Sequence, residues 1–268
     1  MRKIFLHHRY QEIAYEDSGS GPPLVLLHGF PFDREMWSPQ VRGLSEHFRV
    51  LAPDYPGFGR SSVPSESFTI ESLAEVVADF LDAIGIKEAV FLAGLSMGGY
   101  VALAFARQRP DRLRRLILAD TKAAPDDEKA KAGRDRMCRL AQETGATGII
   151  DLLLPKLVSD ETQLTRPEVL EQIKRIAARQ TVSAIIFALC ALRDRPDATQ
   201  GLARITAPTL ILVGEHDAIT PHQCSSEMAE KISGSQLVTI PGVGHMSNLE
   251  DPARFNEHIR NFARILNH

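Results

Sequence analysis

The chain has 268 residues, of which 44% are hydrophobic and 24% are charged, and its formal net charge is −3 at pH 7. This composition is typical of a folded globular protein and excludes disorder for the chain as a whole. The slight acidic excess argues against general nucleic-acid binding. The longest apolar run covers only residues 184–192, whereas a membrane-spanning helix needs about 20 residues, so we expect no membrane partner.

Cysteine usage and the N-terminal segment both bear on the cellular compartment. Cys138, Cys190 and Cys224 show no paired spacing, which argues against a disulfide framework or a zinc site. Residues 1–8 lack the apolar core and the small-residue cleavage site of a secretory signal. We therefore expect a reduced, cytoplasmic protein.

In chain order, the predicted strands are short apolar runs, most of which end at a Gly, Pro or Asp. Runs of this kind are typical of strands buried on both faces of a parallel sheet. The first two are expected to form a hairpin, which is followed by a turn rich in Gly, Ser and Pro. The expected strands cover residues 4–8, 13–17, 24–27, 50–52, 89–93, 116–119, 209–213 and 237–240.

Amphipathic helical segments lie between these strands, at residues 70–84, 97–107 and 253–266. In the first of them the apolar residues share one face, and Gly85 follows as a stop signal. The alternation of strand and helix predicts an α/β fold with a mostly parallel sheet and helices on both faces. Ligands of such sheets bind beyond the carboxyl ends of the strands.

The alternation stops between Thr121 and about Thr199, where helical patterns appear without a convincing strand. These patterns cover residues 128–143, 147–158, 167–179 and 182–192. They predict a helical insertion over the sheet, whose apolar residues mostly pack against one another and the core, while a few line a pocket. The expected organisation is a core of residues 1–120 and 200–268 with an inserted segment of residues 121–199.

The segment Gly94-Leu95-Ser96-Met97-Gly98-Gly99 lies between an expected strand and an expected helix. It is the G-x-S-x-G pattern in the context that the pattern requires. Its glycines relieve crowding at a sharp turn, which leaves Ser96 strained and its hydroxyl exposed near the helix N-terminus. Ser96 is therefore the candidate nucleophile, and the alternative is a glycine-rich turn with a solvated serine.

A serine hydroxyl is a weak nucleophile and needs a general base. His245 follows the last expected strand, at the same end of the sheet as Ser96. Asp217 follows the preceding strand and is the candidate carboxylate that orients the imidazole. The order Ser96, Asp217, His245 is the one expected on this type of sheet. The competing carboxylates are Asp120, Glu215 and Asp251.

The oxyanion of the reaction needs two backbone donors. One is the N–H of Met97, directly after the nucleophile. The other comes from His28-Gly29-Phe30-Pro31, where Pro31 has no N–H and Phe30 is the natural donor. We expect His28 to hold this loop through its side chain rather than to act in catalysis. Phe30, Met97 and Ile219 are the residues expected to contact substrate.

Another glycine-containing loop, residues 54–61 with the sequence Asp-Tyr-Pro-Gly-Phe-Gly-Arg-Ser, follows the strand at 50–52. It lacks the Gly-Lys-Ser/Thr ending of a phosphate loop and the spacing of a dinucleotide-binding turn. We expect it to be a structural turn at the edge of the site.

Taken together, these motifs resemble the α/β-hydrolase superfamily over nearly the whole chain. The resemblance implies an eight-stranded, mostly parallel sheet flanked by helices, with a helical cap inserted after strand six. Within the superfamily, the chain is similar to small carboxylesterases, to 3-oxoadipate enol-lactonases and to cofactor-free haloperoxidases (perhydrolases). Ser96 differs from the aspartate that haloalkane dehalogenases and epoxide hydrolases have at this position, so those activities are disfavoured.

The resemblance implies a serine hydrolase that acts on small-molecule carboxylic esters and needs no metal or organic cofactor. The alternative activities are lactone opening and a perhydrolase side reaction. An enol-lactonase would need a cation in the pocket for the carboxylate of its substrate. The candidates in the insertion are Arg134, Arg136, Arg139, Arg175 and Arg179. A rival from another class is a non-catalytic ligand-binding receptor. The sequence does not indicate an oligomeric state.

Overall fold

The computed structural model describes residues 1–9 and 11–264. One eight-stranded sheet forms its centre, and it is mostly parallel, as predicted. In chain order the strands are β1 (Arg2–Leu6), β2 (Gln11–Ser18), β3 (Pro23–Leu27), β4 (Arg49–Pro53), β5 (Val90–Leu95), β6 (Leu113–Ala119), β7 (Thr209–Gly214) and β8 (Gln236–Ile240). They are arranged in the order β1-β2-β4-β3-β5-β6-β7-β8, and only the pairs β1–β2 and β2–β4 are antiparallel.

The central strands are buried on both faces because each carries an unbroken apolar run. In β3, Leu24 and Leu26 pack into one hydrophobic cluster, whereas Val25 and Leu27 pack into another. Successive side chains of a strand point to opposite faces, so one run supplies both cores. A strand of this composition is stable only when helices cover both sides of the sheet.

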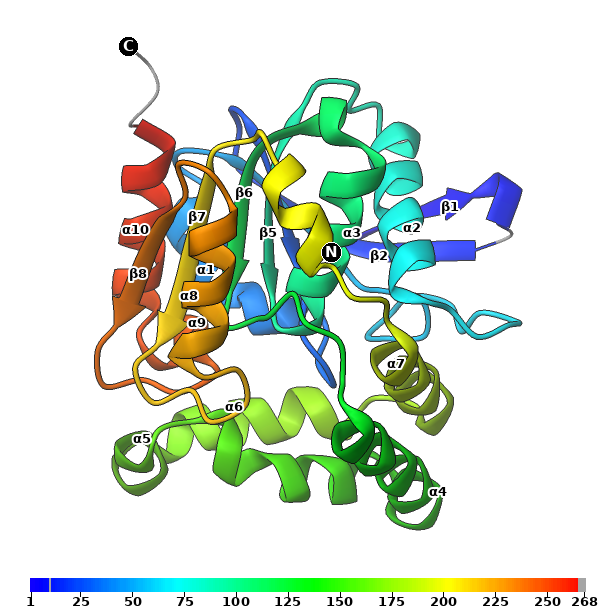
Figure 1. The fold of residues 1–268 in the computed structure, drawn as a ribbon. Coiled ribbons are helices and arrows are strands. Elements are labelled where there is room, and N and C mark those ends of the chain that lie inside the picture. Colours follow the sequence, from blue (N-terminus) through cyan, green and yellow to red (C-terminus); the bar gives the residue numbers. More distant parts are fainter. Residues whose placement is uncertain (10, 265–268) are drawn as a thin grey trace.

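Helices cover both faces of the sheet. The helices outside the insertion are α1 (Ser38–Leu44), α2 (Ile70–Ala83), α3 (Met97–Gln108), α8 (His222–Lys231), α9 (Ser247–Glu250) and α10 (Pro252–Arg264). Figure 1 shows α2, α3 and α8 on one face, and their apolar residues share a single cluster. Those of α1 and α10 belong to the cluster of the other face. The flanked sheet predicted from the sequence is therefore confirmed.

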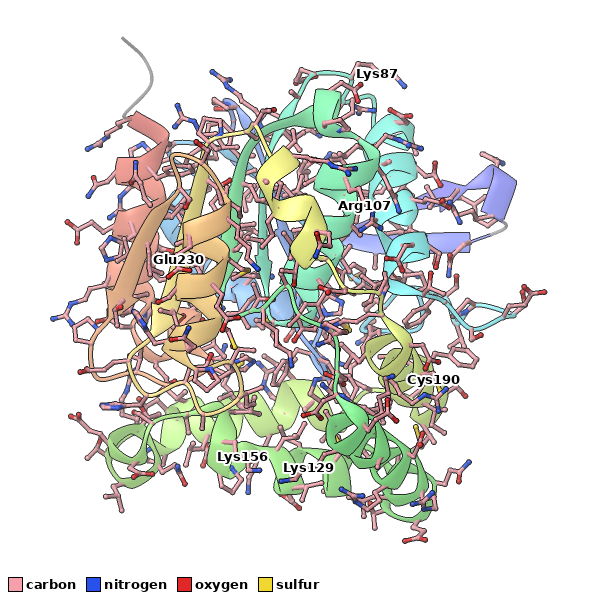
Figure 2. The ribbon with its side chains drawn as sticks, viewed as in Figure 1. Lys87, Arg107, Lys129, Lys156, Cys190 and Glu230 are labelled. Atoms are coloured by element: carbon pink, nitrogen blue, oxygen red, sulfur yellow. The ribbon has the colours of Figure 1, made fainter. Side chains whose placement is uncertain are left out.

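The predicted helical insertion lies between β6 and β7. Its helices are α4 (Glu128–Leu157), α5 (Asp160–Thr165), α6 (Pro167–Ala178) and α7 (Val182–Asp194). Gly145, with φ 68° and ψ −163°, breaks α4 into the two helical parts that the sequence predicts. Figure 1 places the insertion beyond the end of the sheet toward which the strand arrows point. In Figure 2 the exposed Lys129 and Lys156 lie on the insertion, far from Lys87 at the opposite end of the molecule. The exact division into core and insertion domains stays a prediction.

Some local predictions differ from the structure. The first strand begins at Arg2 rather than Ile4. The short helices α1, α5, α8 and α9 are not predicted, because a few helical turns with a weak apolar face carry little periodic signal. Residues 265 and 266 of the expected last helix lie outside the described residues.

No single described helix is both long and apolar enough to cross a membrane, and α6 and α7 meet that criterion only as a pair bent by 97°.

Candidate active site

Ser96 occupies the sharp turn between β5 and α3. Its φ of 54° and ψ of −115° are strained for a residue with a side chain. The turn is possible because its flanking glycines have no Cβ. A Cβ on Gly94 would lie 2.1 Å from the carbonyl oxygen of Gly98, and a Cβ on Gly98 would lie 2.0 Å from that of Leu27. The backbone therefore holds Ser96 partly exposed at the carboxyl end of the sheet.

His245 and Asp217 come from the loops that follow β8 and β7. His245 Nδ1 lies 2.8 Å from Asp217 Oδ2 and 2.9 Å from Oδ1, and both residues are buried. Asp217 is fixed by the backbone N–H groups of Ile219 and Thr220 and by the Thr220 hydroxyl, which donates to Oδ2 at 2.6 Å. The carboxylate is thus positioned to accept a hydrogen bond from the Nδ1–H of His245.

Each member of this pair shifts the pKa of the other. Burial acts to lower the pKa of His245, but the negative charge of Asp217 outweighs burial and raises that pKa above its ordinary value. Burial acts to raise the pKa of Asp217, but His245 and Thr220 hold it below its ordinary value. An ionised carboxylate beside a more basic imidazole is the arrangement required of a general base and its orienting acid.

Asp120 lies close to this pair but has other partners. Its Oδ1 accepts a hydrogen bond from Gly214 N at 2.8 Å, and its Oδ2 accepts one from the Ser247 hydroxyl. Burial and repulsion by Asp217 raise the pKa of Asp120 well above its ordinary value. Among the described residues, the only carboxylate that bonds to His245 is Asp217. Asp120 is therefore better suited to hold the β7 loop than to orient the base.

The two other competing carboxylates also have partners of their own. Glu215 is exposed and accepts a hydrogen bond from Gly242 N at 2.9 Å. Asp251 accepts a hydrogen bond from Arg254 N at 3.0 Å at the start of α10. Both side chains stabilise loop or helix ends.

Phe30 and Met97, the candidate oxyanion donors, lie on facing segments of the site. Met97 is the first residue of α3, so its N–H has no acceptor within the helix. Phe30 follows β3, and within the described residues its N–H makes no hydrogen bond. Both residues line the same pocket as Ser96. The arrangement leaves two backbone donors available to a developing negative charge.

His28 lies beneath this loop and is buried. Its Nδ1 is 3.0 Å from the carbonyl oxygen of Gly29, and its Nε2 accepts the Tyr55 N–H at 3.0 Å. Burial lowers the pKa of His28 to about 4, so the ring is neutral at physiological pH. These contacts agree with the predicted loop-holding role and keep the imidazole away from the pocket lining.

The loop at residues 54–61 is tied together by a buried carboxylate. Asp54 accepts hydrogen bonds from Arg34 N at 2.8 Å, from the Arg34 guanidinium and from Arg60 N at 2.9 Å. A Cβ on Gly59 would lie only 2.3 Å from Asp54 Oδ2. The loop is thus a tight structural turn, and its polar groups are used within the protein.

A small pocket of about 50 Å³ joins these parts. Its lining residues come from the sheet-end loops and from the insertion. They are Phe30, Ser96, Met97, Tyr100, Arg134, Leu153, Leu157, Leu192, Ile219 and His245. The pocket therefore brings together the predicted nucleophile, base, oxyanion donors and substrate-contacting residues.

Sequence reasoning missed several supporting residues. Tyr100 and Leu192 line the pocket but were not predicted to do so. Tyr100 is four residues after Ser96 on α3, a spacing that places it one helical turn away and could have revealed it. Glu250 accepts hydrogen bonds from Gly244 N and Ser159 N, both at 2.8 Å. No local pattern could have revealed the link from Glu250 to the insertion, because Ser159 is 91 residues away in the sequence.

The described residues contain no group of three or more His, Cys, Asp or Glu side chains arranged to hold a metal ion. Cys138, Cys190 and Cys224 are free thiols, and Figure 2 shows Cys190 on α7, within the insertion.

Comparisons with known proteins match the chain over most of its length. A family model described as alpha/beta hydrolase fold matches residues 22–252. A thermophilic esterase from Thermogutta terrifontis, solved with malate bound, is 40% identical, with a TM-score of 0.94 over 98% of this chain and 97% of that chain. An enol-lactonase from Burkholderia xenovorans LB400 is 29% identical, with a TM-score of 0.88 over 94% of this chain and 96% of that chain. The AB hydrolase superfamily protein YisY of Bacillus subtilis (strain 168) is 31% identical over 92% of this chain and 94% of its own.

Proposed function

The chain belongs to the α/β-hydrolase fold family, and from this premise we propose that it cleaves carboxylic esters of small molecules through Ser96, His245 and Asp217. One observation carries the proposal. A strained, partly exposed serine lines the same pocket as a buried histidine whose Nδ1 contacts a buried carboxylate. The likeness to a 40% identical esterase supports esters as the substrate class.

In the first half of the reaction, Ser96 Oγ attacks the acyl carbon of the ester and His245 Nε2 takes the hydroxyl proton. Asp217 accepts the hydrogen bond from His245 Nδ1–H and stabilises the imidazolium that forms. The tetrahedral intermediate then collapses. Its C–O bond to the alcohol breaks, and His245 returns the proton to the leaving oxygen, which leaves an acyl group on Ser96.

The negative charge of the tetrahedral oxygen is bound by the N–H groups of Phe30 and Met97. Since both donors are fixed before the substrate arrives, little reorganisation is needed when the charge develops. Because most of the pocket wall is apolar, the hydrogen bonds from these two N–H groups are stronger there than they would be in water. Removal of one such donor typically lowers kcat by about 10² to 10³.

In the second half, His245 takes a proton from a water molecule, and the resulting hydroxide attacks the acyl carbon. The bond to Ser96 Oγ breaks, His245 protonates that oxygen, and the free acid leaves. The serine is thereby restored for the next cycle.

The test is turnover of a 4-nitrophenyl ester series from acetate to palmitate. We expect Ser96→Ala to lower kcat by a factor on the order of 10⁶, whereas Ser67→Ala, a change at an exposed serine in another loop, leaves it unaltered. A fluorophosphonate should form an adduct on Ser96 of the folded protein. Ester turnover that survives in Ser96→Ala would overturn the proposal. Absence of both turnover and adduct would favour the non-catalytic receptor.

A second candidate function is the opening of an enol-lactone, and one observation favours it. Of the five arginines that the sequence offers as candidates, Arg134 is the one that lines the pocket, and it places a positive charge near Ser96. Arg175 and Arg179 instead pair with acidic residues of the core, and Arg136 and Arg139 are exposed. 3-Oxoadipate enol-lactone should be assayed beside the ester series. Rapid lactone opening with poor turnover of every ester would identify a lactonase.

A further inference from the structure

Charge is distributed unevenly over the pocket wall. Seven of the ten lining residues are Phe, Met, Tyr, Leu or Ile. Arg134 is the one lining residue that carries a permanent charge. Burying a positive charge in an otherwise apolar wall costs free energy unless the charge has a partner. The contacts of the Arg134 guanidinium therefore show whether it is left to bind a ligand.

Arg134 has one strong partner within the protein. Its Nε donates to Asp126 Oδ2 at 2.9 Å. Its terminal nitrogens make no hydrogen bond to any residue that the structure describes. The side chain retains 21% of its exposure. The edge of the guanidinium with two N–H donors is therefore free to bind a ligand.

Asp126 does not neutralise the positive charge at this site. Its buried carboxylate also lies 2.8 Å from Arg195 Nη1 and 3.7 Å from Lys122 Nζ. Burial acts to raise the pKa of Asp126, but Arg134 and Arg195 outweigh burial and hold it below its ordinary value. Three cations thus share one ionised carboxylate, and a surplus of positive charge remains beside the pocket.

Arg195 is not available to a ligand in the same way as Arg134. Its Nη1 donates to the carbonyl oxygen of Leu192 at 2.6 Å and its Nη2 to that of Ala124 at 2.9 Å. The guanidinium lies over the ring of Tyr100, 4.3 Å from the centroid. Arg195 therefore fixes Asp126 in place, and Asp126 in turn orients Arg134 through Nε.

We propose that Arg134 binds the carboxylate of an anionic substrate, so that the preferred substrates are carboxylate-bearing esters such as monoesters of dicarboxylic acids. A guanidinium with two free N–H groups matches a carboxylate in a paired geometry. The low dielectric of the pocket strengthens that pair. This inference rests on the proposed function for the reaction itself and adds the chemical class of the substrate.

The experiment compares monomethyl succinate with methyl succinamate, which differ by a carboxylate in place of an amide. Wild-type protein is expected to show a higher kcat/KM for the anionic ester. Arg134→Met should reduce the ratio of the two kcat/KM values by about 10- to 100-fold, the size expected for one charge-assisted pair. Arg134→Lys retains the positive charge but loses the planar pair of N–H donors. Its ratio of kcat/KM values should therefore lie between those of the wild type and Arg134→Met.

Arg136→Met is the matched control, because Arg136 lies on the same helix but is exposed and does not line the pocket. Its ratio should equal that of the wild type. The inference is overturned if the wild type does not prefer the anion, or if Arg134→Met leaves the ratio unchanged.

A binding measurement separates this inference from the proposed reaction. Titration calorimetry would follow monomethyl succinate binding to Ser96→Ala protein with and without Arg134→Met. A loss of affinity of at least tenfold supports the anion site even if no ester is turned over, in which case only the proposed reaction fails. Equal affinity in the two variants, together with ester turnover by the wild type, rejects the anion site and keeps the reaction.

Discussion

The loops at the end of the sheet and the helical insertion both contribute to the pocket, but they are held in place differently. Around Ser96, backbone contacts at Gly94 and Gly98 leave no space for a Cβ, and a positive φ fixes the serine. The insertion packs on the core through apolar side chains that share the hydrophobic clusters of the sheet, and polar side chains also attach it to the same loops. Arg179 donates two hydrogen bonds, of 2.6 and 2.7 Å, to Asp33 beside the Phe30 loop.

Two further contacts show the same type of attachment. Gln180 Nε2 donates to Asp33 Oδ2 at 2.8 Å, while its Oε1 accepts Gly59 N at 2.9 Å. Between α4 and α5, Ser159 N donates to Glu250, whose other carboxylate oxygen accepts Gly244 N next to His245. Single substitutions can alter such side-chain contacts without changing the sheet. We therefore infer that the proposed chemistry depends on the backbone around Ser96, and the proposed substrate selection on side chains of the insertion.

Among the tests of this comparison, Asp217→Asn in the loop after β7 should cause the largest loss of activity. The amide cannot stabilise the imidazolium or select its tautomer, so kcat should fall by about 10⁴. The general base must be neutral to act, so activity rises with pH through the pKa of His245. Because Asp217 raises that pKa, the acid limb of the kcat/KM profile should move to lower pH in the variant.

Asp120→Asn is the control for that change. Asp120 does not bond to His245, and an amide resembles the protonated carboxyl that its raised pKa favours. Its loss of kcat should be much smaller. A greater loss in Asp120→Asn than in Asp217→Asn would reassign the orienting acid.

A smaller effect is expected from His28→Gln, which changes the pH dependence of the free energy of unfolding. This variant tests whether the buried, neutral His28 stabilises the loop that carries Phe30. The pKa of His28 is about 4 in the folded protein, below the ordinary value of 6.5. Between these pH values the unfolded chain binds more protons, so the contribution of His28 to stability is lost as pH falls from 6.5 toward 4. The wild type should lose about 3 kcal/mol relative to the variant over this range.

Urea unfolding at several pH values measures this difference. Burial raises the pKa of Asp54 to about 6. This raised pKa makes the folded protein more stable as the pH falls, which is opposite to the effect of His28. Asp54 is present in both proteins, so its contribution cancels in the comparison. Parallel pH curves for the two proteins would show that His28 is not held neutral by the fold.

The smallest effect is expected in the insertion, from Arg179→Met. The change leaves the buried Asp33 with weaker partners and should lower the free energy of unfolding by about 1–2 kcal/mol, since Arg179 itself is one-third exposed. Arg175→Met is the matched control, because Arg175 lies in the last turn of α6 and Arg179 follows directly after that helix. The more exposed pair of Arg175 with Glu35 should contribute about 0.5 kcal/mol or less. Equal losses in the two variants would contradict the role given to Asp33.

Much of the fold could be predicted from local sequence, because each element carries its own signal. The apolar run at Leu24–Leu27 indicates a strand buried on both faces, and the periodic apolar face of Ile70–Ala83 indicates a helix against the sheet. Gly94 and Gly98 around Ser96 identify the strained turn, because only residues without a Cβ fit there. These features depend on residues that are neighbours in sequence.

The tertiary structure alone separated candidates that look equivalent in the sequence. Asp120 and Asp217 both follow a strand, and only the path of the β8 loop brings His245 to Asp217. Five arginines of the insertion were candidates for an anion site, and only the packing of α4 over the pocket selected Arg134. The physical reason is that hydrogen bonds and charge pairs form between residues far apart in the chain, so their partners are fixed by how the elements pack.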